Sequence, residues 1–214
     1  ASGDLTDFRL LSFLKNFNIE KKEIILSTGN SEDHEIESTI NFLNYKTNQN
    51  ISILHCKVQY PDKFETTNLE RISYLSQKFS IPCGFSDHTV GIAVSAMSLY
   101  YNPVYIEKHF TDSRKNQTAD NPMSTEPDEL LQLKNIIKNF KNIKGNGQYT
   151  VSISESKERT YARKGLYLKK DLNKGDIISE NDIISLRPNL DNNSAINYLI
   201  FLNSKVNKNL KKDE

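Results

Sequence analysis

Two histidines stand where short strand-like segments end, at positions that would let them share one metal ion. His88 follows residues 81–87, and His109 closes residues 104–109 about twenty positions later. Imidazole suits divalent transition metals, and two nitrogen ligands leave positions open for substrate oxygen atoms. A lone histidine is more often a hydrogen-bonded structural residue. For two histidines in matched positions, the metal site and the structural role are about equally favoured.

Four strand–helix units must position these histidines. Strands are predicted at residues 23–29, 51–56, 81–86 and 104–109, each followed by apolar residues at helical spacing. A helix is predicted before the first strand, with Leu10, Leu11, Leu14 and Phe17 on one face. Consecutive units of this kind form a parallel sheet covered by helices, and a closed barrel needs eight strands. We therefore predict an α/β protein that contains the C-terminal half of a (β/α)8 TIM barrel, and we expect the N-terminal half upstream of residue 1.

The helices of this half-barrel are read from their apolar faces. The predicted inward residues are Ile36, Ile40 and Leu43, then Leu69, Ile72, Leu75 and Phe79, then Ala93, Ala96 and Met97, and finally Leu130, Leu133, Ile137 and Phe140. Thr125 is the predicted cap of the last helix, and Pro127 lies in its first turn. The chemistry is then expected at the C-terminal ends of the strands, where a barrel carries its active site.

The character of the sequence changes after Gly147. Helical periodicity fades, and short β-like segments with glycine turns follow. We predict the barrel half at 1–147, a charged linker at 148–161 and a small β-rich domain at 162–214.

Composition limits the kinds of partner that we expect this chain to bind. The chain has 28 Lys and Arg against 27 Asp and Glu, a net charge of +1, so no overall field favours nucleic acid or an anionic membrane as a partner. Cys56 and Cys83 lie in or beside apolar segments and are predicted to be buried free thiols of a reducing compartment. No apolar run approaches the roughly 20 residues that span a bilayer. We predict a soluble, cytoplasmic protein.

The ordered motifs resemble the sialic acid synthases, which condense phosphoenolpyruvate with an N-acetylated hexose to give nine-carbon 2-keto sugar acids. The matching stretches are residues 1–4, 25–29, His55-Cys56 with Tyr60-Pro61, 84–89, 106–111, Asp120 with Ser124, 174–176 and Arg187-Pro188. The segments FSDHT and IEKHFT at this separation are the most specific. The resemblance implies a TIM barrel followed by an antifreeze-like (SAF, β-clip) domain, here incomplete at its C-terminal end.

The resemblance also implies roles for residues at the predicted barrel top. His88 and His109 would bind the divalent metal, usually Mn²⁺, with Mg²⁺ or Co²⁺ as alternatives. Ser2, Ser27 and Ser86 would hold phosphoenolpyruvate through its phosphate and carboxylate. By residue type alone, a serine before a helix is more often a cap, so only their expected co-location favours the ligand role.

Four further residues concern the acceptor sugar. Tyr60 and Asp120 would face it, although the first could be only a turn residue and the second a loop carboxylate. Asp4 would lie near the reacting carbons as a catalytic acid. Arg187 would reach the acceptor's N-acetyl group in the other subunit, which implies a domain-swapped homodimer, whereas by exposure statistics it is an ordinary surface arginine.

One departure from the family pattern and several alternatives stay open. Val58 stands where relatives carry a small polar residue, so a contact to phosphoenolpyruvate is lost or is replaced by Lys57. The acceptor could be N-acetylmannosamine, its 6-phosphate, or a di-N-acetylated 6-deoxy sugar that gives legionaminic or pseudaminic acid. The competing functions are a metal-dependent TIM-barrel hydrolase and a non-catalytic fragment, and this chain alone is expected to be inactive.

Overall fold

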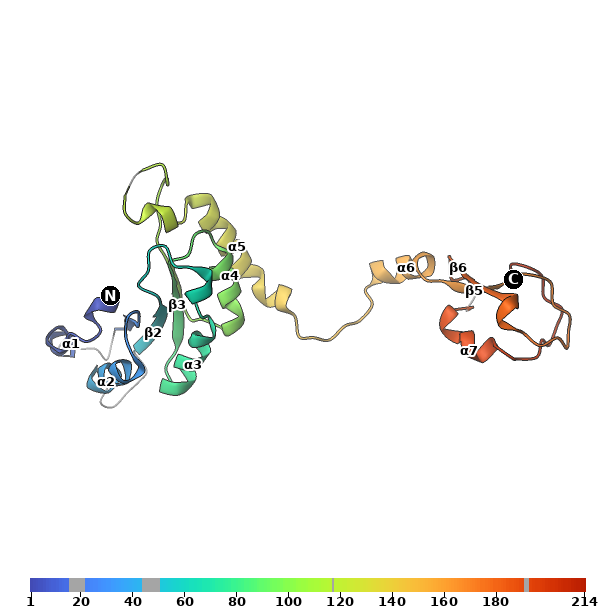
Figure 1. Cartoon of the computed structure of the whole chain (residues 1–214), viewed down its shortest axis with the longest axis horizontal. Coiled ribbons are helices and arrows are strands. Elements are labelled where there is room, and N and C mark those ends of the chain that lie inside the picture. Colours follow the sequence, from blue (N-terminus) through green and yellow to red (C-terminus); the bar gives the residue numbers. More distant parts are fainter. Residues whose placement is uncertain (16–21, 44–50, 117, 191–192) are drawn as a thin grey trace. The chain divides into compact units, whose positions relative to one another are not determined.

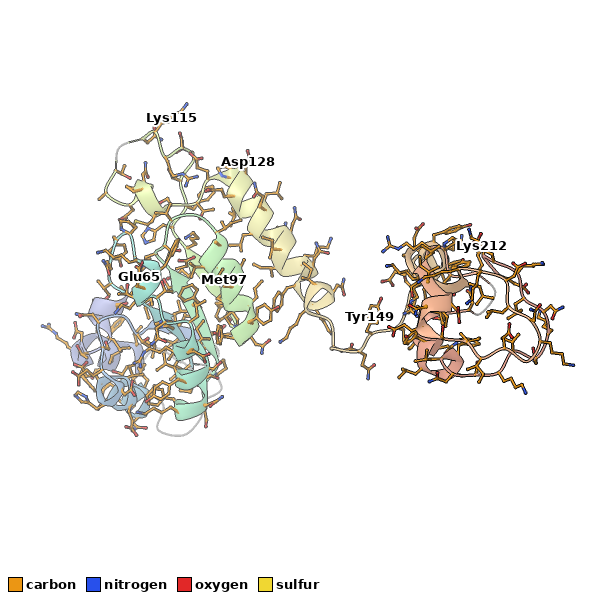
Figure 2. All side chains as sticks on the ribbon, turned by 45° about the vertical axis from the view of Figure 1, so that its right-hand side comes forward. Glu65, Met97, Lys115, Asp128, Tyr149 and Lys212 are labelled. Carbon is orange, nitrogen blue, oxygen red and sulfur yellow. The ribbon has the colours of Figure 1, made fainter. Side chains whose placement is uncertain are left out.

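The computed structural model describes residues 1–15, 22–43, 51–116, 118–190 and 193–214 of the 214-residue chain. The chain divides into two compact units, Ala1–Gly145 and Asn146–Glu214. Tyr149 lies on the segment that follows this division (Figure 2).

Unit 1 is built on four parallel strands in chain order. The strands are β1 (Ile24–Ser27), β2 (Ile51–Cys56), β3 (Cys83–Asp87) and β4 (Ile106–Lys108), and they pair in the order β1-β2-β3-β4. A crossover that contains a helix links each strand to the next, and this makes consecutive strands parallel neighbours. The predicted sequence of four strands is confirmed, and β2 has the bounds expected for it.

Helices follow every strand, as predicted, but Ala93 and Met97, expected to face inward, are exposed, and Val94 is buried instead. They are α2 (Asp33–Leu43), α3 (Glu70–Phe79), α4 (Ala93–Ser98) and α5 (Pro127–Lys144), and α1 (Phe8–Lys15) precedes the sheet (Figure 1). Single 3-10 turns are η1 (Ser2–Asp4), η4 (Phe64–Thr66), η5 (Leu99–Tyr101) and η6 (Asn121–Met123). Of the residues expected on the first helix, Phe17 lies outside the described residues.

The core of unit 1 lies between the sheet and its helices. Since side chains alternate across a strand, Leu26, Ile53 and Phe85 share the face that packs against the helices. Helix residues complete this core, among them Ile36, Ile40, Ile72, Leu75 and Val94. We call the sheet face that carries Leu26, Ile53 and Phe85 the outer face. The inner face carries the alternate residues Ser27, Leu54, Cys56, Gly84, Ser86 and Glu107.

Helix α5 departs from its prediction in two respects. Leu133 is buried, but Leu130 and Ile137 are 43% and 44% exposed, so a single residue of the three joins the core. The N-cap is Glu126 rather than Thr125, and the Glu126 amide donates to Glu129 Oε2 (3.1 Å). The carboxylate three residues into the helix therefore decides where α5 begins.

Unit 2 combines short helices with one small antiparallel sheet. Strands β5 (Gly165–Leu168) and β6 (Ile183–Leu186) pair, and Leu166, Leu168, Leu172, Ile178, Ile183 and Val206 form its core. Helix α7 (Tyr198–Phe201) and the 3-10 turns η7 (Glu180–Asp182) and η8 (Ala195–Asn197) complete it. The predicted loss of helical structure is wrong at α6 (Ile153–Ala162), which lies largely within the expected linker. Its capping box explains the helix, because the Glu155 amide donates to Ser152 Oγ (3.2 Å).

Within the described ranges, no helix is long and apolar enough to cross a membrane.

Candidate active site

The C-terminal ends of β3 and β4 bring three aromatic rings together. The ring centres of His88 and His109 are 5.2 Å apart, and the Tyr60 ring lies 4.4 Å from His88 and 5.8 Å from His109. Each histidine directly follows its strand, and the two strands are hydrogen-bonded neighbours. The pairing of adjacent parallel strands thus places two imidazoles, 21 residues apart in sequence, at one point.

The His88 ring is held by a main-chain carbonyl. Its Nδ1 lies 2.6 Å from the Lys57 carbonyl oxygen, and a carbonyl can only accept, so Nδ1 carries the proton. In the neutral ring Nε2 then carries the lone pair, and it lies 3.5 Å from Ser86 Oγ. A histidine fixed in this way by an acceptor on one nitrogen presents the other nitrogen as a ligand.

His109 is more open and has an acidic neighbour. Its side chain is 32% exposed, and Nδ1 lies 3.7 Å from Asp120 Oδ2. The backbone at His109 is fixed by the Thr125 amide, which donates to its carbonyl (2.7 Å). Tyr60, Asp120, His88 and His109 therefore lie together in one cluster, and their expected acceptor and metal roles stay predictions.

This cluster fits a divalent ion that takes two nitrogen ligands from the protein. Across the part of the chain that the structure describes, no group of three or more His, Cys, Asp or Glu side chains converges as a metal site. A pair of imidazoles, one with its tautomer fixed, matches a site whose remaining ligands are oxygen atoms. The donor set supports an open site and does not support a closed structural one.

The three predicted phosphoenolpyruvate serines differ in their surroundings. Ser86 is 3% exposed, and its hydroxyl donates to Glu107 Oε1 (2.7 Å). Ser27 lies on the same inner face by strand register. Ser2 in η1 lies 3.1 Å from Cys56 Sγ, so η1 contacts the end of β2. Ser27 and Ser86 therefore lie on the inner face of the sheet, and Ser2 lies beside the C-terminal end of β2.

Two predicted residues lie in other surroundings. Asp4 is in η1 with an exposed side chain. Arg187 belongs to unit 2, where its Nε donates to the Ala162 carbonyl (2.7 Å). The roles expected for both stay predictions.

Glu107 is a site residue that sequence reasoning missed. It lies two positions before His109, so the period of the strand puts both on the inner face. Its carboxylate accepts from Ser86, and its charge acts on Tyr60 together with that of Asp120. The pKa of the Tyr60 phenol is raised, first by its desolvation and then by these charges, so the phenol stays protonated at neutral pH.

Comparisons with known proteins identify the family and the fold. A family model described as the NeuB family matches residues 1–149. N,N'-diacetyllegionaminic acid synthase of Campylobacter jejuni is 39% identical over 215 residues, which cover all of this chain and 63% of that protein. Pseudaminic acid synthase of the same organism is 29% identical over 200 residues, 94% of this chain and 58% of that protein.

A solved structure shares the fold. The crystal structure of N-acetylneuraminic acid (sialic acid) synthetase from Leptospira borgpetersenii in complex with citrate matches with a TM-score of 0.62 and 31% identity. The match covers 73% of this chain and 54% of that one. The four strands thus form a curled parallel half-barrel of the kind found in that synthetase. The chain spans about 63% of the length of the legionaminic acid synthase. The predicted resemblance is confirmed, and the chain belongs to the NeuB family.

Proposed function

We propose that the protein carrying this chain condenses phosphoenolpyruvate with an N-acetylated amino sugar and water, and releases a nonulosonic acid of the sialic-acid type and phosphate. The observation that carries the proposal is the imidazole pair of His88 and His109 beside the hydroxyl-bearing inner face. Membership of the NeuB family, with relatives named as legionaminic and pseudaminic acid synthases, supports the reaction class.

His88 and His109 are the proposed ligands of Mn²⁺, with Mg²⁺ or Co²⁺ as alternatives. Bound there, the ion would supply Lewis-acid chemistry at the aldehyde oxygen of the open-chain sugar. The Lys57 carbonyl keeps His88 Nε2 turned toward the site, so no ring rotation is needed when a ligand arrives. Tyr60 and Asp120 border the same point and are the proposed contacts of the acceptor.

The serines are the proposed donors to the phosphoenolpyruvate oxygens. Ser86 has one proton to donate and gives it to Glu107, so its hydroxyl must rotate away from Glu107 when it binds an anion. Glu107 is then free to accept a proton from water that adds at C2 of the former phosphoenolpyruvate. Holding both substrates on one rim provides alignment, which accounts for a large share of the rate in bimolecular reactions.

The test uses the protein at its natural full length. Phosphate release from phosphoenolpyruvate is followed with no sugar and with each of three acceptors: N-acetylmannosamine, its 6-phosphate and a di-N-acetylated 6-deoxy hexose. Release that requires one of the sugars supports the synthase and identifies the acceptor class. Release without sugar favours the hydrolase, and no release with any of them favours a non-catalytic chain. The variant His88→Ala should abolish metal-dependent turnover.

Arg187 is the proposed link to a second subunit. An arginine in unit 2 can make forked contacts to carbonyl oxygens, as recognition of an N-acetyl group requires. Mixing an Arg187→Ala protein with a His109→Ala protein should restore part of the activity, because a mixed dimer then holds one intact composite site. If activity does not return despite proven subunit exchange, the arginine does not act across subunits.

A further inference from the structure

An ion pair is buried directly behind the two histidines. Asp87 precedes His88 and Lys108 precedes His109, so alternation turns this pair to the outer face while the imidazoles turn inward. Lys108 Nζ lies 3.2 Å from Asp87 Oδ2, and the two side chains are 4% and 0% exposed. Both charges are therefore removed from water one residue away from the proposed metal ligands.

The contacts of the pair reach Thr89, next to His88, and Ser95 on α4. Asp87 Oδ1 accepts from the Thr89 amide (2.8 Å) and from the Thr89 hydroxyl (2.7 Å). The Ser95 hydroxyl donates to Asp87 Oδ2. Lys108 Nζ donates to the Thr89 carbonyl (2.7 Å). The residues on both sides of His88 are thus tied to the residue before His109.

Stability is a poor explanation for this arrangement. The cost of removing two charges from water offsets most of their attraction, and apolar residues of similar volume are often as stabilising. What the charges add here is fixed geometry, because Lys108 reaches both the Asp87 carboxylate and the Thr89 carbonyl across the junction of β3 and β4. Groups behind metal ligands orient those ligands and tune the site.

We propose that Asp87 and Lys108 are positioning residues that set the spacing and direction of the His88 and His109 imidazoles, and through them the affinity for a divalent ion. This inference rests on the proposed metal role of the histidines. Nothing in it requires the pair to contact substrate.

The test measures Mn²⁺ affinity by isothermal titration calorimetry in the full-length protein, together with the melting temperature. The double variant Asp87→Asn/Lys108→Met removes both charges and so leaves no buried charge unpaired. We expect its melting temperature to stay within a few degrees of the wild type and its Kd for Mn²⁺ to rise about ten- to a hundredfold. The matched control is Asp33→Asn/Lys78→Met, which removes an ion pair of 2.7 Å between α2 and α3. Its Kd should not change.

His88→Ala and His109→Ala separate failure of this inference from failure of the proposed function. Wild-type Mn²⁺ affinity in both histidine variants would show that these histidines do not bind the ion, and the proposed metal site would be wrong. Lost binding in those variants with wild-type affinity in the Asp87/Lys108 double variant would overturn the positioning role alone. If the double variant does not fold, Lys108→Arg takes its place, because it keeps the charge but changes the donor geometry. An unchanged Kd in that folded variant would also overturn the inference.

Discussion

The two faces of the four-stranded sheet differ in kind although their residues alternate along the same strands. On the outer face Leu26, Ile53 and Phe85 are 8%, 0% and 2% exposed and pack against helices. On the inner face Ser86 and Glu107 bond to each other beside the two histidines. The difference teaches that two neighbouring residues of one strand, such as Phe85 and Ser86, can act mainly on stability in one case and on chemistry in the other.

The largest expected effect comes from truncating an outer residue. Phe85→Ala should lower the free energy of unfolding by about 3–5 kcal/mol, because it opens a cavity between the sheet and the helices. The neighbouring inner substitution Ser86→Ala should cost only about 1 kcal/mol, the usual contribution of one hydrogen bond. Urea unfolding of both variants measures the contrast. Equal losses of unfolding free energy in the two variants would contradict the contrast between the two faces.

The next effect belongs to the inner face and is catalytic. Ser86→Ala should raise the KM for phosphoenolpyruvate about tenfold, since losing one hydrogen bond to a charged group costs about 1.5 kcal/mol or more. Ser98→Ala is the matched control, because Ser98 is a fully buried serine on α4 that donates to the Ser95 carbonyl (2.7 Å). Steady-state kinetics should show its KM unchanged. A similar rise in both variants would point to a general structural effect.

The two cysteines provide a smaller contrast. Burial raises the pKa of the outer thiol, Cys83, to about 11, and raises that of the inner thiol, Cys56, against an opposing hydrogen bond from Ser2. Because the thiolate is the reactive form, Cys56 should react with iodoacetamide several times faster than Cys83 between pH 7 and 9. Mass spectrometry of the native protein resolves the two sites. Faster labelling of Cys83 would contradict the contrast.

The smallest effect lies beyond the outer face, where α2 meets α3. Hydrogen bonds from Lys78 and Tyr74 and the charge of Arg71 hold the pKa of Asp33 well below its usual value of 3.8. The folded pKa is depressed, so this stabilisation is complete above about pH 3.8 and is lost as the pH falls toward the folded value. Asp33→Asn should therefore flatten the loss of melting temperature as the pH falls from about 4 to about 2. An unchanged acid profile would mean that the cluster adds nothing to stability.

Much of unit 1 could be predicted from sequence because its strands are short apolar runs bounded by polar residues. Residues 51–56 gave the bounds of β2, and the apolar spacing of Ile36, Ile40 and Leu43 located α2. Helix α6 was missed because helical periodicity fades after Gly147 and the segment was assigned to a linker, whereas Ser152 and Glu155 form a capping box. Local hydrogen bonding outweighed the pattern there.

The site was predictable in part. The ends of adjacent strands located His88 and His109, but Glu107 and the Asp87–Lys108 pair depend on the register between β3 and β4. Register follows from packing and is not written in either strand alone. The contact of Ser2 with Cys56 joins residues 54 positions apart, and no local pattern indicates it.

Gly29 limits how this site could be re-engineered. A β-carbon there would lie 2.7 Å from both Cys56 Sγ and Ser2 Oγ, and 2.8 Å from Val58 Cγ2, well inside the roughly 3.5–4.0 Å at which carbon atoms attract. A mutational library aimed at broader acceptor use gains nothing from position 29 alone, because Ser2, Cys56 and Val58 would all have to give way. The same restriction applies in evolution, so a larger residue at 29 should be inherited only together with changes at these three contacts.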